Sequence, residues 1–365
     1  MVGAVETLSS LEGIADRVPP GETRHFRLLG SESFSGTPVR IPIAVKRGHE
    51  AGPRLFLTAA LHGNEINGTG AIRDLITDPS MQLKAGLMLL VPVINVLGFD
   101  RHSRYLPDRR DLNRCFPGSR TGSLSSRMAR TVFDEIVRRC DFGIDLHTAA
   151  VRRTNYPNVR GDLSNEGVAR LAKSFGCQWI ISAKGPRGSL RREATRNSIP
   201  TIILEAGEVW KVEPGVISVA HRGVKNVLAD LGMLDAVPER PPLQVTIERT
   251  KWTRADRGGF LQFHTSPGHI VARGEPLATC TSLLGAERNV IISPFDGVVI
   301  GMTTLPAVSP GEPVCHLGRI DPATMESLTG TRKAKIDPVS QRLRDDLATN
   351  VNVVRHNPHP DEEPT

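Results

Sequence analysis

The chain has 365 residues, a hydrophobic content of 39% and a formal net charge of +7. This length calls for one large domain with a smaller one, and the composition excludes a chain that is disordered throughout. The basic residues are scattered and aromatic residues make up only 4%, which excludes the pattern of a nucleic-acid-binding protein and leaves a basic surface suited to small anions.

The N-terminal segment and the apolar runs bear on where the protein resides. The first 20 residues carry Glu6, Glu12 and Asp16 and lack a basic start followed by an apolar run, so we expect no secretory signal and a cytoplasmic protein. Apolar stretches such as Leu87–Val96 are shorter than the roughly 20 residues of a membrane-spanning helix, so we expect no membrane partner. The five cysteines are widely spaced without C-x-x-C, which argues against a disulfide framework and a thiolate metal cluster.

Apolar strands alternate with amphipathic helices over the first two thirds of the chain. Continuous apolar runs suit strands that are buried on both faces, and the alternation is typical of a mostly parallel sheet. The sequence therefore predicts a three-layer α/β/α sandwich with a mostly parallel (mixed) sheet over residues 1–237, with N-terminal strands at about 20–50. The main strands are expected at Arg40–Val45, Leu55–Ala60, Leu87–Val93, Phe142–Leu146, Trp179–Ser182 and Thr201–Leu204, and the helices at Glu65–Ile76, Ser125–Arg138, Asn165–Phe175 and Val216–Leu231.

The sequence pattern changes after Pro238–Pro242, where three prolines in five residues predict a linker. Residues 243–320 contain short strands punctuated by glycine and proline, including the similar turns Gly274–Pro276 and Gly311–Pro313. This repetition predicts a small all-β, barrel-like domain with internal pseudo-symmetry. Residues 331–365 are charged and contain proline, so we expect a mobile or loosely docked tail.

Four side chains that can bind a metal or move a proton follow predicted strands. His62 and Glu65 lie in A-A-L-H-G-N-E, His147 ends F-G-I-D-L-H, and Glu205 follows T-I-I-L. The carboxyl ends of parallel strands share one edge of the sheet, where ligand sites form, so we expect these residues to converge there. Each of them alone could be structural, but their joint placement favours a site.

The predicted site has the composition of a zinc centre. Two imidazoles and one carboxylate are a known ligand set for catalytic zinc, with the fourth position left to water. The spacing of three between His62 and Glu65 lets both side chains face one centre across a turn. Asp145, two residues before His147, is expected to orient an imidazole from behind, although strand alternation equally allows it to be a buried structural acid. We therefore predict one Zn²⁺ per chain.

An arginine-rich loop, Arg104–Gly118, lies between the two histidine segments. Arginines bind carboxylates in a bidentate manner and can stabilise the oxyanion that forms when a carbonyl is attacked. The dense proline, aspartate, asparagine and glycine residues of this loop indicate a structured loop with a function. The predicted ligand is therefore a small molecule that carries a carboxylate.

Four motifs together carry a family resemblance. They are H-G-N-E at 62–65, D-L-N-R at 111–114, D-L-H-T at 145–148 and L-E-A-G at 204–207. In this order they resemble the succinylglutamate desuccinylase and aspartoacylase family, a branch of the zinc carboxypeptidase fold, over residues 54–234. The β-rich C-terminal part resembles the barrel of biotinyl and lipoyl carrier modules. Its only lysine, Lys251, lies far from a carrier hairpin, so we expect the barrel to shape the cleft entrance or a homo-oligomer interface.

The resemblance implies roles in catalysis. His62, Glu65 and His147 would bind zinc, and Glu205 would act as the general base that moves a proton from water to the leaving amine. Arg104 would stabilise the tetrahedral oxyanion.

The resemblance also implies a substrate-binding set. Asn113 and Arg114 would bind the substrate carboxylate, and Arg196 would be a further carboxylate-binding arginine, with the neighbouring Arg191 as the alternative counterpart. Aspartoacylase closes its site with a tyrosine from its C-terminal part, whereas both tyrosines of this chain lie before residue 160. Family members that have this kind of arginine-rich loop and a C-terminal barrel include deacetylases of acetylated diamino acids.

The predicted function is a zinc-dependent hydrolase that cleaves the amide bond of a small N-acyl amino acid or related acylated metabolite, of the deacylase, desuccinylase or deacetylase type. A zinc carboxypeptidase acting on short peptides is one alternative, and activity on dipeptides would distinguish it. A non-catalytic metal-binding or scaffold protein is the other, and the absence of bound metal at neutral pH would favour it.

Overall fold

The computed structural model describes residues 5–330, 341–343 and 345. The chain forms two compact units, one of Met1–Ala149 with Pro157–Thr246 and one of Ala150–Tyr156 with Ile247–Thr365. The predicted tail at 331–365 falls almost entirely outside the described residues. Within the described part of the chain, no helix combines the length and the apolar character that crossing a membrane requires.

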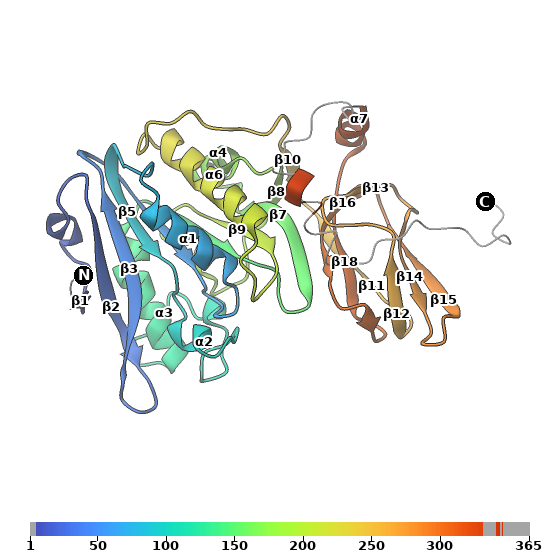
Figure 1. Cartoon of the computed structure of the whole chain (residues 1–365), viewed down its shortest axis with the longest axis horizontal. Coiled ribbons are helices and arrows are strands. Elements are labelled where there is room, and N and C mark those ends of the chain that lie inside the picture. The colour runs from blue at the N-terminus through green and yellow to red at the C-terminus, as the bar shows by residue number, and fades with distance from the viewer. Residues whose placement is uncertain (1–4, 331–340, 344, 346–365) are drawn as a thin grey trace. The chain divides into compact units, whose positions relative to one another are not determined.

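The first unit is built on a mixed sheet, as predicted (Figure 1). Its central strands pair in parallel, β4 with β5 and with β6, and β6 with β9, while β3 runs antiparallel to both β2 and β5. In order across the sheet, the strands are β1 (Glu6–Leu8), β2 (Thr23–Glu32), β3 (Pro38–Arg47), β5 (Ala85–Val91), β4 (Glu50–Ala59), β6 (Phe142–His147), β9 (Thr201–Gly207), the end of β7 (Arg153–Gly161), β8 (Trp179–Ser182) and β10 (Val245–Ile247).

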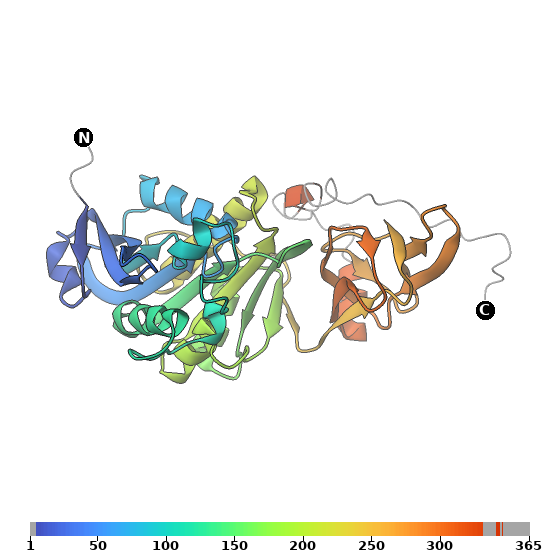
Figure 2. The same ribbon diagram turned by 90° about the horizontal axis from the view of Figure 1, so that it is seen from below.

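Helices cover both faces of this sheet and complete the predicted three layers. The helices are α1 (Asn67–Thr77), α2 (Val96–Phe99), α3 (Leu124–Glu135), α4 (Glu166–Phe175), α5 (Leu190–Arg196) and α6 (Pro214–Asp230), with 3-10 turns η1 (Ile14–Arg17), η2 (Leu112–Arg114) and η3 (Val137–Arg139). On one face α1 packs against α6, which packs against α4. Figure 2 shows α1 and α3 on opposite faces of the sheet.

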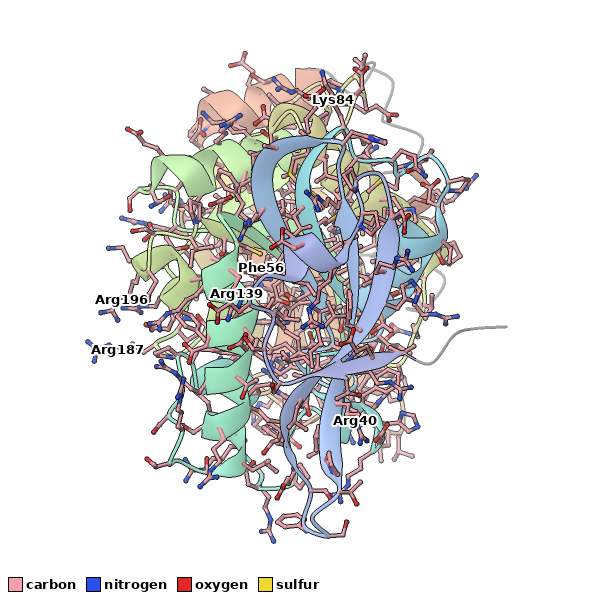
Figure 3. All side chains as sticks on the ribbon, turned by 90° about the vertical axis from the view of Figure 1, so that its left-hand side faces the viewer. Arg40, Phe56, Lys84, Arg139, Arg187 and Arg196 are labelled. Atoms are coloured by element: carbon pink, nitrogen blue, oxygen red, sulfur yellow. The ribbon has the colours of Figure 1, made fainter. Side chains whose placement is uncertain are left out.

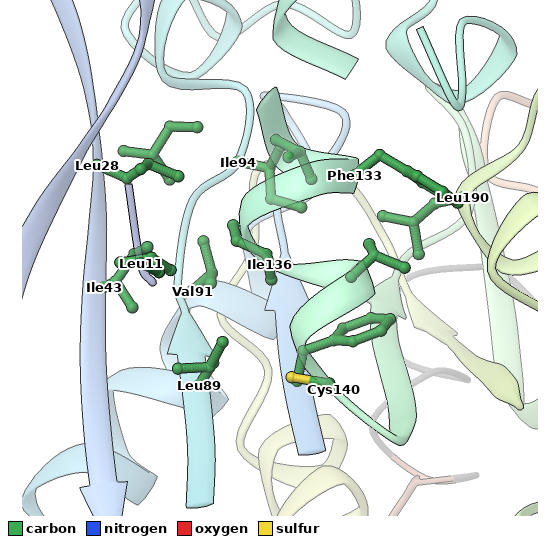
Figure 4. Close-up of a cluster of buried hydrophobic side chains, with 14 of the residues drawn as sticks. Leu11, Leu28, Ile43, Leu89, Val91, Ile94, Phe133, Ile136, Cys140 and Leu190 are labelled. Carbon is green, nitrogen blue, oxygen red and sulfur yellow. The ribbon is translucent and has the colours of Figure 1, made fainter. Parts of the chain in front are cut away.

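The sequence of α3 explains its position. The Ser123 side chain caps the helix by accepting a hydrogen bond from the Ser126 N–H, and residues at helical spacing, such as Met128 and Val132, face the sheet. They join the core cluster between α3 and strands β2 to β5, which includes Phe133, Ile136 and Leu28 (Figure 4). This core fixes one side of the sheet edge where the candidate site lies.

The second unit consists of two small sheets around its own apolar core. The first half of β7 pairs with β16 (Gly297–Thr303), which also pairs with β13 (Ile270–Val271) and β18 (Pro313–Arg319), and β18 pairs with β11 (Thr250–Arg254). The other sheet has the order β15 (Glu287–Ile292), β14 (Pro276–Thr281), β12 (Gly259–Phe263) and β17 (Ala307–Val308). Helix α7 (Pro322–Gly330) follows.

The two Gly-Glu-Pro turns of this unit have matching geometry. Gly274 and Gly311 have φ values of 84° and 85°, which glycine adopts without strain. The glutamate that follows each glycine makes two hydrogen bonds with the residue three positions before it, Glu275 with Ala272 and Glu312 with Ser309. In both turns the glutamate N–H donates to the backbone carbonyl of that residue, and the glutamate carboxylate accepts from its backbone N–H. The repeated turn predicted from the sequence is therefore also a repeat in three dimensions.

Residues 150–156 correct the predicted domain boundaries. The sequence analysis placed them in the first domain, but they belong to the second unit. The physical reason is strand pairing, because Thr154 and Asn155 lie opposite Met302 and Gly301 of β16. The polar residues of β7 interrupt the apolar run from which a buried strand is predicted, so this strand was not expected.

Candidate active site

The candidate site lies at the carboxyl edge of β4, β6 and β9 in the first unit. His147 and Glu205 are register partners on the adjacent parallel strands β6 and β9, so their side chains point to the same face. Asp145, two residues before His147, shares that face, and its register partner on β4 is Thr58. The sheet thus places an imidazole and two carboxylates side by side.

His62 and Glu65 reach this edge from a turn between β4 and α1. The Glu65 N–H donates to the His62 carbonyl at 3.0 Å, and α1 begins only at Asn67. The prediction that the helix starts at Glu65 is therefore wrong by two residues, because this N–H closes the turn. Gly63 is required here, since a Cβ atom would lie 2.1 Å from the backbone carbon of Gly98 in α2.

Three side chains in this turn and strand form a compact, buried donor set. The two Glu65 carboxylate oxygens lie 2.7 Å from His62 Nδ1 and 2.9 Å from His147 Nδ1. One ligand atom from each of the three residues lies within 4.8 Å of the others, and all three residues are buried. Two imidazole nitrogens and a carboxylate in this arrangement fit a divalent cation that accepts nitrogen and oxygen ligands.

The outer nitrogen of each imidazole is held by a carboxylate. Asp145 Oδ2 lies 2.6 Å from His147 Nε2, and Asp111 Oδ1 lies 3.1 Å from His62 Nε2. The Thr58 hydroxyl donates to the other oxygen of Asp145 at 2.7 Å. These contacts orient both rings with Nδ1 toward Glu65, as outer carboxylates do in metal sites.

The electrostatics of the cluster favour positive charge. Burial lowers the pKa of His147, but Asp145 and Glu65 raise it more, so it lies well above its ordinary value. Burial likewise lowers the pKa of His62, and Glu65 and Asp111 outweigh this effect. Burial raises the pKa of Glu65, yet the two imidazoles hold it well below its ordinary range. A cation is thus stabilised between these groups.

Arg104 and Asp111 complete one side of the cluster. The Arg104 guanidinium donates to Glu65 Oε1 at 3.2 Å and to Asp111 Oδ2 at 3.0 Å. Asp111 also caps η2 by accepting from the Asn113 N–H. It therefore links His62, Arg104 and the arginine-rich loop, a contact that the sequence analysis did not identify although Asp111 opens the D-L-N-R motif.

Glu205 has a basic neighbour that the sequence analysis did not identify. Arg160 Nη1, from β7, lies 3.9 Å from Glu205 Oε1, and Asn158 of the same strand donates to the Glu205 carbonyl. Both residues belong to the polar strand that escaped prediction, so no sequence signal singled them out.

Asn113 and Arg114 belong to η2, and Asn113 contacts the start of α5. The Asn113 side-chain carbonyl accepts from the N–H of Leu190 at 2.9 Å, at the start of α5. The Arg114 guanidinium donates to the Asn113 backbone carbonyl. Asn113 thus connects the arginine-rich loop to the helix that carries Arg191 and Arg196.

Arg191 and Arg196, two of the three arginines of α5, lie in different environments. Arg196 has a side chain that is 66% exposed and pairs with Glu193, and Figure 3 shows it extending from the outer surface. Arg191 is buried, and its Nε and Nη1 atoms have no hydrogen-bond partner. Burial, and then the neighbouring Arg160, lowers the pKa of Arg191 to about 10, while Glu205 opposes this shift.

Comparisons with known proteins agree on one family. Residues 51–231 match the model of the succinylglutamate desuccinylase/aspartoacylase catalytic domain. The N-alpha-acetyl-L-2,4-diaminobutyric acid deacetylase of Halomonas elongata is 24% identical over 253 residues, covering 66% of this chain and 73% of that protein.

Solved structures show the same fold. The product-bound ectoine utilization protein EutE (DoeB) of Ruegeria pomeroyi has a TM-score of 0.72 at 22% identity and covers 82% of this chain and 97% of its own. The succinylglutamate desuccinylase/aspartoacylase of Rhodobacter sphaeroides has a TM-score of 0.70 at 24% identity, with 82% and 96% covered.

Proposed function

Because residues 51–231 of this chain belong to the succinylglutamate desuccinylase/aspartoacylase catalytic-domain family, we propose that the protein is a zinc-dependent hydrolase that cleaves the amide bond of a small N-acyl amino acid or related acylated metabolite. The observation that carries this proposal is the buried His62, Glu65 and His147 set with Glu205 on the neighbouring strand. The deacetylase of Halomonas elongata, whose name specifies an N-acetylated amino acid, supports the same reaction class.

Zinc fits this donor set. Its preferred ligands are imidazole nitrogen and carboxylate oxygen, and three protein ligands leave a position for water or substrate. We propose that His62 and His147 bind it through Nδ1 and Glu65 through its carboxylate, with Asp111 and Asp145 orienting the rings. When bound, zinc would polarise the scissile carbonyl and lower the pKa of water toward ~7.

Different side chains of the protein would then carry out proton transfer and stabilisation of the oxyanion during amide cleavage. Glu205 accepts a proton as water attacks the carbonyl carbon, and it delivers that proton to the nitrogen as the C–N bond breaks. Arg104 donates hydrogen bonds to the developing oxyanion. The products are a carboxylic acid and an amine, and the water supplies the oxygen and both hydrogens that balance the reaction.

Arg191 is the strongest candidate for the substrate carboxylate. Two buried nitrogens of its guanidinium, Nε and Nη1, lack hydrogen-bond partners and would be satisfied by an anion, and Arg160 adds positive charge beside it. Both arginines lie near Glu205, so a carboxylate on the amine half of the substrate would be held where the leaving nitrogen is protonated. Asn113 and Arg114 remain part of the proposed carboxylate site through their link to α5.

The test of the proposed function is hydrolysis of a panel of N-acetyl, N-succinyl and N-formyl amino acids and dipeptides by zinc-loaded protein. We expect release of an acyl acid from one class of N-acyl amino acid. Cleavage of dipeptides alone would replace the proposal with a carboxypeptidase. Absence of both bound metal and hydrolysis would indicate a non-catalytic protein.

The arginines of α5 give a matched pair of variants. Arg191→Ala is expected to raise KM by roughly 10- to 150-fold, which corresponds to one lost hydrogen bond with a charged partner. Arg196→Ala, at an exposed position about 140° around α5 from Arg191, should leave KM within about twofold. Steady-state kinetics on the best substrate of the panel measure both. A larger increase of KM in Arg196→Ala than in Arg191→Ala would assign binding of the substrate carboxylate to Arg196 instead.

A further inference from the structure

An exposed tryptophan is tied to two loops of the candidate site. Trp210 follows β9, its backbone N–H donates to the Asn64 carbonyl at 2.9 Å, and its indole N–H donates to the His102 carbonyl at 3.1 Å. Asn64 directly precedes Glu65, and His102 lies two residues before Arg104. The tryptophan therefore lies against the segments that supply a proposed zinc ligand and the proposed oxyanion donor.

The conformation of Trp210 is costly and is maintained by the surrounding loop. Its φ is 60°, a left-handed value that bulky residues rarely adopt, and its side chain is 52% exposed. Glu213 fixes the loop, since its carboxylate accepts from the Asn67 side chain and from the Glu208 N–H. Glycine would adopt this backbone freely. Core packing does not account for an aromatic residue here, because about half of the Trp210 surface is exposed.

The order of strands shows which half of the substrate would meet this ring. Glu205 lies near the carboxyl end of β9 and would protonate the leaving amine, so the amine half lies on that side of the site. Asn64 follows β4, on the other side of β6 in the sheet. The acyl half, which extends away from the leaving nitrogen, therefore points toward the loops that Trp210 joins.

The charges around the ring favour an uncharged acyl group. Lys211, next to Trp210, pairs with Glu208, and Arg104 pairs with Asp111 and Glu65. Because both cations are paired with carboxylates, they attract an anionic acyl tail only weakly, and a cationic tail would be repelled by both of them. An apolar tail would instead cover the exposed indole face and remove it from water.

We infer that Trp210 is a specificity-determining residue that forms an apolar wall for the acyl half of the substrate, so that acyl groups longer than acetyl are favoured. This inference rests on the proposed function, because it assigns the acyl side from the role of Glu205. It goes further by naming the substrate class as amino acids that carry an uncharged aliphatic or aromatic acyl group.

The test compares N-acetyl, N-butyryl, N-hexanoyl and N-benzoyl derivatives of one amino acid in four proteins: wild type, Trp210→Gly, Trp210→Phe and Val212→Ala. In the wild type we expect kcat/KM to rise about twofold per added methylene, for a group half covered by the ring. Trp210→Gly relieves the strained backbone, so it should fold normally and show no gain in kcat/KM with chain length relative to its own N-acetyl activity.

The other two variants separate the ring from the hydrogen bond. Trp210→Phe keeps an aromatic face but loses the indole donor to His102, so it should retain most of the chain-length gain. Val212→Ala removes exposed apolar surface two residues away and should behave as wild type. An unchanged gradient in Trp210→Gly, or a gradient that is lost equally in Trp210→Phe, would overturn the inference.

A binding measurement separates this inference from the proposed function. Hexanoate and benzoate, the acids that such substrates would release, should change the tryptophan fluorescence of the wild type but not that of Trp210→Phe. If the wild type hydrolyses none of the substrates, the proposed function fails, and this fluorescence difference alone decides whether an acyl group reaches the ring. Equal responses in both proteins would place the acid elsewhere and refute the inference.

Discussion

Replacing Glu205 with glutamine is expected to lower kcat by about 10²- to 10⁴-fold, the usual contribution of a positioned general base. Glutamine has the same shape and can keep hydrogen bonds to its surroundings, but its amide cannot accept and return a proton at neutral pH. Because Glu205 is not one of the three residues of the donor set, bound zinc should remain at the wild-type level. Initial rates and metal analysis of the purified variant measure the two quantities.

The matched control for this variant is Glu166→Gln. Glu166 is an exposed carboxylate at the start of α4, so the same chemical change there should leave kcat unchanged. Wild-type turnover in Glu205→Gln would exclude Glu205 as the base. Loss of zinc together with turnover would instead make Glu205 part of the metal site.

Replacing His147 with alanine is expected to abolish zinc binding at micromolar metal and to reduce hydrolysis to background. The change removes one of three proposed protein ligands, leaves Asp145 buried without its imidazole partner and leaves Glu65 with only one of its two imidazoles. Asp145→Asn keeps all three ligands and loses only the outer carboxylate, so it should weaken zinc binding by about 10- to 100-fold. Zinc titration against a competing chelator ranks the two variants.

Thermal unfolding gives an independent check on the same site. Zinc that binds only the folded protein raises Tm, so a chelator should lower the Tm of the wild type and leave that of His147→Ala unchanged. His25→Ala, at an exposed position of β2, serves as the control and should respond as wild type does. An equal chelator effect in His147→Ala would show that the stabilising metal is bound elsewhere.

The layers of the first unit could be predicted from the sequence because buried parallel strands leave a strong apolar signal. The segment Trp179–Ser182 was predicted with the bounds it has in β8, and the predicted helix at 165–175 is capped by the Asn165 side chain. The Gly-Glu-Pro repeat was also predictable, since a left-handed glycine before a strand leaves a clear local signature. These features depend on short stretches of chain.

Features that depend on pairing between distant segments could not be predicted in this way. Strand β7 carries arginine and asparagine side chains because it borders the site and changes partner along its length, and no periodic apolar pattern survives. The burial of Arg191 and the exposure of Arg196 depend on which face of α5 packs against the sheet. The spacing of the two arginines in the sequence does not show which face that is. Asp111 acquires its contact with His62 only when the arginine-rich loop folds back over the turn.

The assignment of residues 150–156 to the second unit has a consequence for the order of events during biosynthesis. The strand that follows His147 has to remain without its β16 partner until residues 297–303 have left the ribosome. At a synthesis rate of roughly 5–20 residues per second, this delay is on the order of ten seconds. Nascent chains of intermediate length would therefore expose a strand edge beside the proposed zinc ligand His147, and such edges are templates for aggregation. Expression of fragments that stop before β16 should consequently yield insoluble product, whereas the full chain can close this edge itself.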